Sequence, residues 1–154
     1  MSLYKFAQAI EGSPLGQLIR QSDWAFPVIE IVHLVALATL GGAVLMICLC
    51  VFGVGIKMPA KEVEAGARPY VIGAVTALIV TGVLLGVSES VKLLDREAFT
   101  IKMIALALAL LFTFLVFSPM VRRGATGAGV RAAAGLTMIL WLTVAMAGRW
   151  IGFS

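Results

Sequence analysis

Charged residues are scarce in this chain: Asp, Glu, Lys and Arg make up 13% of its 154 residues, about half the share of an ordinary soluble domain. Hydrophobic residues make up 61%. A water-soluble domain this short has too little interior to bury so much apolar surface. The composition therefore excludes an ordinary soluble fold and predicts an integral membrane protein whose partner is the lipid bilayer.

Cysteine and histidine are rarer still. The two cysteines, Cys48 and Cys50, lie in one apolar run, and residues two apart on a helix point to nearly opposite sides. That spacing fits neither a mutual disulfide nor a shared metal ion, so we expect both to be small apolar helix residues. The chain has one histidine, His33.

The basic residues, 12 against 8 acidic ones, give a formal net charge of +4. They lie between apolar runs, which is typical of loop charges that orient a membrane protein, and we expect no nucleic-acid binding. The connections between crossings one and two and between three and four carry six of them, against four in the N-terminal segment and the connection between crossings two and three. This excess favours a topology with both termini outside, which is the periplasmic side for a protein of a bacterial inner membrane.

Four charge-free stretches come close to or exceed the roughly 20 residues needed to cross a bilayer. They are residues 34–56, 69–88, 103–121 and 132–148. Helix is the expected state, because an open strand in lipid leaves its backbone unpaired. Short connections predict an all-α, up-down four-helix bundle over residues 23–154. The expected crossings are residues 26–55, 69–90, 98–118 and 130–152, and the expected loops are 57–67, 90–97 and 122–129.

Residues 1–22 predict a separate interfacial amphipathic segment. Apolar residues recur at helical spacing from Leu3 to Ile10, and Gly12-Ser13-Pro14 then ends that helix and supplies a cap for a second. The segment lacks the continuous apolar core of a cleavable signal peptide. Trp24, which follows it, and Trp150 are expected anchors at the membrane interfaces.

Polar side chains recur inside the expected crossings, where a charge costs several kcal/mol unless it is paired or hydrated. Because alternate helices run in opposite directions, five of them fall in one leaflet: Glu30, His33, Glu89, Lys102 and Arg149. Counted from the helix starts, His33 lies about 10 Å deep and Lys102 about 6 Å deep, with Met146 near the depth of His33. Two alternatives to a polar pocket stay open. Lys102, Arg149 and Glu89 could extend to the membrane interface, and Glu30 and His33 could form a hydrogen bond that is only structural.

Several chemistries suit this set. The charges could neutralise each other, or Lys102 and Arg149 could clamp an anionic ligand. His33 could relay protons, since imidazole ordinarily titrates near neutrality. It could also bind a metal or haem iron, with Met146 as a second ligand.

The pattern Trp24-x-x-Pro27-x-x-Glu30-x-x-His33, then Gly41, resembles the first helix of a widespread family of uncharacterised four-helix bacterial membrane proteins. The likeness continues through Arg68-Pro69, Thr81-Gly82, Phe99-x-x-Lys102, Trp141 and Gly148-Arg149. It implies the four-helix fold but no activity, because none is established for that family. Cys48-Leu49-Cys50 stands where the family usually has Asp-Leu-Arg, so any function that uses that acid and base is in doubt here.

A looser, architectural resemblance is to HemJ-type protoporphyrinogen oxidases and CopD-type copper-resistance proteins. The HemJ type has a first-helix histidine taken to bind haem and a lysine early in its third helix that is needed for activity. His33 and Lys102 occupy analogous places. The resemblance implies a haem b or related site, although likeness of fold is a weak argument for function.

Three functions stay open at this point, and none requires an enzymatic activity. The leading one is an outer-leaflet pocket that binds haem b, another tetrapyrrole or a metal, with a redox role. His33 would be the ligand, Lys102 and Arg149 would neutralise carboxylates, and Glu30 would orient the imidazole or take its proton. The second is a homo-oligomeric proton or ion channel or transporter subunit, assembled through glycine-rich helix faces such as Gly82 with Gly86. The third is a structural subunit of a larger membrane complex.

Overall fold

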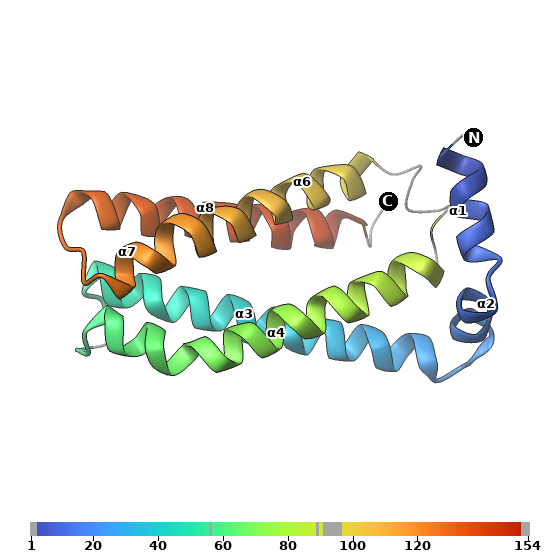
Figure 1. Cartoon of the computed structure of the whole chain (residues 1–154), viewed down its shortest axis with the longest axis horizontal. Helices are drawn as coiled ribbons and strands as arrows, with labels where there is room; N and C mark the ends of the chain where they lie inside the picture. Colours follow the sequence, from blue (N-terminus) through green and yellow to red (C-terminus); the bar gives the residue numbers. More distant parts are fainter. Residues whose placement is uncertain (1–2, 56, 89, 91–96, 152–154) are drawn as a thin grey trace.

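The computed structural model of the chain describes residues 3–55, 57–88, 90 and 97–151, and the elements in these ranges are helical (Figure 1). Four of the helical stretches are long and apolar enough to span a membrane. These are Ala25–Phe52, Ala60–Ser88, Phe99–Arg122 and Ala128–Ala147. They pack as an up-down bundle, which confirms the predicted all-α fold.

The bundle is made of two helical hairpins that lie side by side (Figure 1). The first pairs α3 (Ala25–Phe52) with α4 (Ala60–Ser88). The second pairs the third crossing with α8 (Ala128–Ile151). The third crossing has three consecutive parts: α6 (Glu97–Phe112), the π-helical turn η1 (Thr113–Phe117) and α7 (Ser118–Arg122). Contacts of α3 with α8 and of α4 with α7 join the hairpins.

Two short helices, α1 (Leu3–Glu11) and α2 (Pro14–Gln21), lie across one end of the bundle (Figure 1). The Oγ of Ser13 accepts a hydrogen bond from the backbone N–H of Gly16 at 3.3 Å, so the predicted cap is confirmed. Gly16 is buried, and an added Cβ would stand 3.2 Å from the carbonyl oxygen of Val87 in α4. The lack of a side chain at Gly16 therefore allows α2 to dock against the end of α4.

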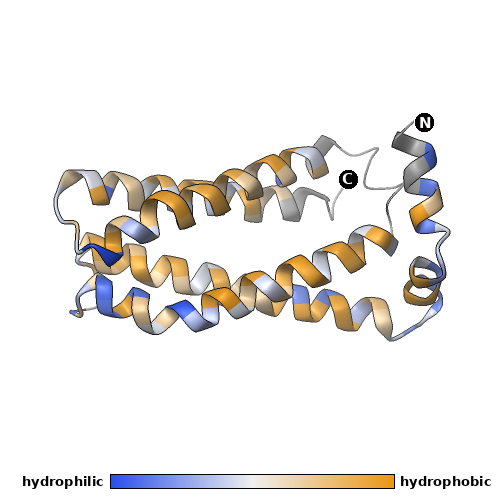
Figure 2. Ribbon diagram, viewed as in Figure 1, coloured by the Kyte–Doolittle hydropathy of each residue, from blue (hydrophilic) through white to orange (hydrophobic). Residues whose placement is uncertain are grey.

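A narrow core runs along the bundle, and most of the apolar surface lies outside it. Leu40, Ala109, Phe117 and Ala134 are at most 1% exposed. However, only 22% to 33% of the apolar window of each crossing is buried inside the chain. Figure 2 shows hydrophobic residues along the crossings, with hydrophilic ones gathered at the end that carries the α3–α4 and α7–α8 loops. The remaining apolar surface requires lipid, so the chain is a multi-pass membrane protein.

The second crossing begins earlier than the sequence predicted. Helix α4 starts at Ala60, so most of the expected loop 57–67 is helical and Pro69 lies inside the helix. Residues 60–67 are rich in alanine, lysine and glutamate, which are strong helix formers. Their propensity, with burial of Val63 and Ala67 in the core, offsets the backbone hydrogen bond that Pro69 removes.

The third crossing continues past Pro119, where the sequence predicted its end. In a regular α-helix, the proline ring clashes with the carbonyl group four residues earlier. The turn η1 lies immediately before Pro119 and widens the helix, and the N–H of Ser118 bonds to the carbonyl of Thr113. This π-helical turn accommodates the proline, so the helix runs on to Arg122. The expected loop at 90–97 falls almost wholly outside the described residues.

Candidate functional site

His33 is half-buried on α3 and faces α4. Its Nδ1 lies 2.8 Å from the Oγ1 of Thr81. Its Cε1 would stand 3.5 Å from a Cβ added at Gly82. Thr81 and Gly82 therefore form a seat for the imidazole: the hydroxyl orients the ring, and the glycine leaves room for it.

Thr81 also decides which nitrogen of His33 carries the proton. The Oγ1 of Thr81 lies 2.6 Å from the carbonyl oxygen of Ala77, so the hydroxyl proton lies between these two oxygens. A hydroxyl has only one proton, and Oγ1 must therefore accept a hydrogen bond from Nδ1–H. The neutral ring then has a lone pair on Nε2, and no other described residue bonds to the ring. Such a nitrogen can bind a metal or haem iron, or accept a proton.

Lys102 is the predicted charged residue of the third crossing. Its side chain is half-buried on α6. His33 and Lys102 come from crossings that are far apart in the sequence. The meeting of their side chains at a common depth stays a prediction from the helix directions.

The other predicted site residues are either exposed or outside the described residues. Glu30 is exposed, and the described part of the chain contains no hydrogen bond between it and His33; Thr81 orients the ring. Met146 is 68% exposed, so its thioether lies outside the core. Glu89 and the side chains of Arg149 and Trp150 lie outside the described residues. Trp24 is 80% exposed beside the start of α3, where an interfacial anchor is expected.

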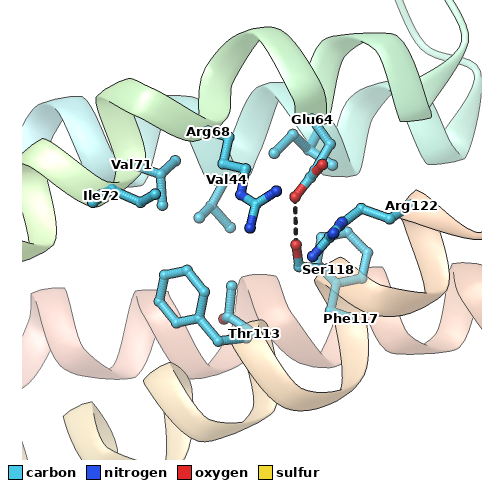
Figure 3. Close-up of a pocket in the computed structure, with 11 residues that line it drawn as sticks. Val44, Glu64, Arg68, Val71, Ile72, Thr113, Phe117, Ser118 and Arg122 are labelled. Carbon is cyan, nitrogen blue, oxygen red and sulfur yellow. Dashed lines mark hydrogen bonds between the residues drawn. The ribbon is translucent and has the colours of Figure 1, made fainter.

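A second polar cluster, which the sequence did not predict as a site, lies at the opposite end of the bundle (Figure 3). Glu64 is 7% exposed, and the Ser118 hydroxyl donates to its Oε1 at 2.5 Å. This bond joins α4 to α7 beside a cavity of about 240 Å³. Nearby, the indole Nε1–H of Trp141 donates to the Oγ1 of Thr113 at 3.0 Å.

The cysteines belong to neither cluster. Both are free, and Cys48 is buried with its thiol 3.6 Å from the carbonyl oxygen of Ala134. Cys50 is half-buried and packs against the core. They serve as helix-packing residues, as expected from their spacing.

Comparison with known proteins places the chain in a family. The profile of a family of unknown function (DUF6644) matches residues 10–154. The chain belongs to this family. No curated protein and no solved structure matches it, so the looser resemblance to HemJ-type and CopD-type proteins gains no support. The matched range includes all four crossings and both polar clusters.

The sequence did not predict the hydrogen bond between Thr81 and His33, although Thr81-Gly82 is part of the pattern shared with the four-helix family. The helix directions give one indication of this contact. His33 follows the start of α3, and Thr81 precedes the end of α4, by nearly the same number of residues, so the two lie at nearly the same depth. Depth alone does not give the rotation of each helix about its axis. A threonine inside a membrane helix more often bonds to its own backbone, as Thr76 does to the carbonyl of Ile72.

The size of the side chain at position 82 should control the imidazole. A Gly82→Ala variant should keep any His33-dependent ligand, because its Cβ at 3.5 Å makes an ordinary van der Waals contact. A Gly82→Leu variant should push the ring from Thr81 and lower ligand affinity at least about tenfold, a loss typical of disturbing a ligand's supporting residues. Ligand titration of the two purified variants measures this. Equal ligand affinity in Gly82→Ala and Gly82→Leu would contradict the claim that Gly82 leaves room for the imidazole.

Proposed function

We propose that this protein binds haem b or a related tetrapyrrole through His33, in the outer leaflet of a bacterial inner membrane, and that it has a redox role there. The observation that carries the proposal is the hydrogen bond between His33 and Thr81. It fixes the neutral imidazole with its proton on Nδ1 and leaves Nε2 available for coordination. Histidine ligands in metal sites are almost always oriented in this way, by a hydrogen bond to the other ring nitrogen.

A tetrapyrrole fits the described residues better than a bare metal ion. Zinc sites use three or four protein ligands, and the described residues contain no group of three His, Cys, Asp or Glu side chains that could hold a metal ion. Haem iron needs only one or two axial ligands from the protein. His33 would hold the iron and Lys102 would pair with a propionate, while Met146 as a second ligand and Arg149 as a second cation stay predictions from the sequence. The bound group would supply one-electron chemistry.

Protein purified from its native membranes tests this proposal. We expect a Soret band in its absorbance spectrum and iron in its elemental analysis, both retained through detergent exchange. A related tetrapyrrole without iron would give the Soret band alone. Protein with neither a Soret band nor a bound metal would contradict the proposal.

A second candidate is a homo-oligomeric proton or ion channel. Among the described residues, a Cβ added at Gly41, Gly42, Gly73 or Gly86 would meet no neighbouring atom within 4 Å. Packing within one chain therefore gives no reason for glycine at these positions, whereas close approach of another transmembrane helix would. In such an assembly, the Nε2 of His33 would accept and release the proton.

Oligomer mass in detergent and flux in liposomes separate the two candidates. The channel predicts a defined oligomer and a flux that His33→Ala reduces. A monomer without flux favours the tetrapyrrole site alone. A flux that His33→Ala leaves unchanged would contradict the proton path through this residue.

A further inference from the structure

We propose that the cavity at the loop end of the bundle is a binding site for a phosphate group. The cavity lies between α4 and the η1–α7 segment, with α3 behind it, and has a volume of about 240 Å³ (Figure 3). This is far more than the roughly 10–15 Å³ that one water needs by the same measure. Along α4, Arg68 of this cavity is about 20 Å from Thr81 of the histidine site, so the two proposals depend on different residues.

Two arginines from different crossings face the cavity. Figure 3 shows the guanidinium groups of Arg68, from α4, and Arg122, from α7, pointing into it from two sides. Within the described ranges, neither group has a hydrogen bond or ion pair in this chain. A guanidinium group offers paired N–H donors in a planar fork that matches the oxygens of a phosphate. Two such groups without partners favour an anion between them.

Glu64 offsets only part of this positive charge. Its carboxylate is buried and accepts a hydrogen bond from the Ser118 hydroxyl, so it helps to hold α4 against α7. The outer part of the same hollow is lined by two more cations, Lys61 and Arg123, together with Arg68, Arg122 and Glu64. The balance of charge at the mouth is thus positive, which raises the local concentration of anions.

The floor of the cavity is apolar, and its lining includes Val44, Ile47, Val71 and Phe117. An anionic phospholipid would place its phosphate between the arginines and an acyl chain over this floor. Inorganic phosphate or a phosphorylated solute would use the arginines alone. The chemistry common to both sources is a phosphate group held by two guanidinium groups, and binding would tie the two hairpins together where α4 meets α7.

Trp141 provides an optical reporter for this cavity. Its indole N–H bonds to the hydroxyl of Thr113, which lines the cavity. Replacing Trp24 and Trp150 with phenylalanine leaves Trp141 as the single tryptophan of the full chain. We would titrate this protein with inorganic phosphate in detergent, and in parallel compare nanodiscs of phosphatidylcholine containing increasing amounts of phosphatidylglycerol.

We expect a saturable change in Trp141 fluorescence in at least one arm. A response to inorganic phosphate identifies a soluble source, and a response to phosphatidylglycerol alone identifies a lipid headgroup. Arg68→Gln and Arg122→Gln should each weaken binding about tenfold or more, because each removes charge-assisted hydrogen bonds. Arg68→Lys should fall between wild type and Arg68→Gln, because lysine keeps the charge but not the planar fork.

Arg131→Gln is the matched control, because Arg131 is an exposed residue near the start of α8 that lines neither part of the hollow. It changes the net charge by the same amount as the test variants and should alter affinity less than about twofold, as expected for a screened surface charge. The absence of a saturable response in both arms would overturn the proposal. Equal weakening by Arg131→Gln would also overturn it, because the arginines would then act only as loop charges.

Discussion

Replacing His33 with alanine should abolish tetrapyrrole binding, and replacing Thr81 with valine should weaken it by about 10- to 100-fold. His33→Ala removes the coordinating nitrogen. Thr81→Val keeps the shape of the side chain but removes the hydroxyl that accepts from Nδ1–H. The imidazole would then be free to rotate and to exchange its proton between the two nitrogens, so only part of the population would present Nε2.

Titration of purified protein with haem, followed by the Soret absorbance, measures both effects. Thr76→Val is the matched control, since Thr76 is an exposed threonine on the same helix whose hydroxyl also bonds to a carbonyl four residues earlier. It should bind haem as the wild type does. An unchanged affinity in His33→Ala, or equal losses in Thr76→Val and Thr81→Val, would contradict the assignment of the site.

Phe117→Ala should lower the free energy of unfolding by about 3–5 kcal/mol, the usual cost of truncating a buried phenylalanine. Phe117 is 1% exposed and lies in the η1 turn, where it packs in the core and also lines the loop-end cavity. Its removal would leave a void between the hairpins. Reversible unfolding in mixed detergent micelles measures the change.

Leu115→Ala is the control for this variant, because Leu115 belongs to the same π-helical turn but is 70% exposed. A lipid-facing leucine exchanges one apolar contact for another, so the expected change is within about 0.5 kcal/mol, as for other exposed positions. Similar losses of unfolding free energy in Phe117→Ala and Leu115→Ala would contradict the structure. They would mean that the third crossing does not turn Phe117 toward the core and Leu115 toward lipid.

The fold followed from the sequence because lipid imposes simple rules on it. Long apolar runs must be helices, and short connections make them antiparallel. The errors in the predicted helix bounds arose at two prolines. Pro69 was expected to mark the start of the second crossing, and Pro119 the end of the third. Tertiary packing and a π-helical turn carry both helices through these prolines, and neither effect is readable from local propensity.

The same errors explain why one polar cluster was predicted and the other was not. His33 and Lys102 lie inside the expected crossings, so their depth could be counted from the helix starts. Arg68 directly precedes Pro69, and Arg122 follows Pro119 by three residues. Both were therefore assigned to loops, where basic residues are ordinary. Their meeting at one cavity depends on the extended helices of the structure.

The ¹⁵N spectrum of His33 tests the central claim most directly. The chain contains one histidine, so selective labelling gives one signal for each ring nitrogen. The Thr81 hydrogen bond predicts a protonated Nδ1 and an unprotonated Nε2 in the ligand-free protein, and a mixture of tautomers in Thr81→Val. A ring protonated on Nε2, or a spectrum that Thr81→Val leaves unchanged, would contradict it.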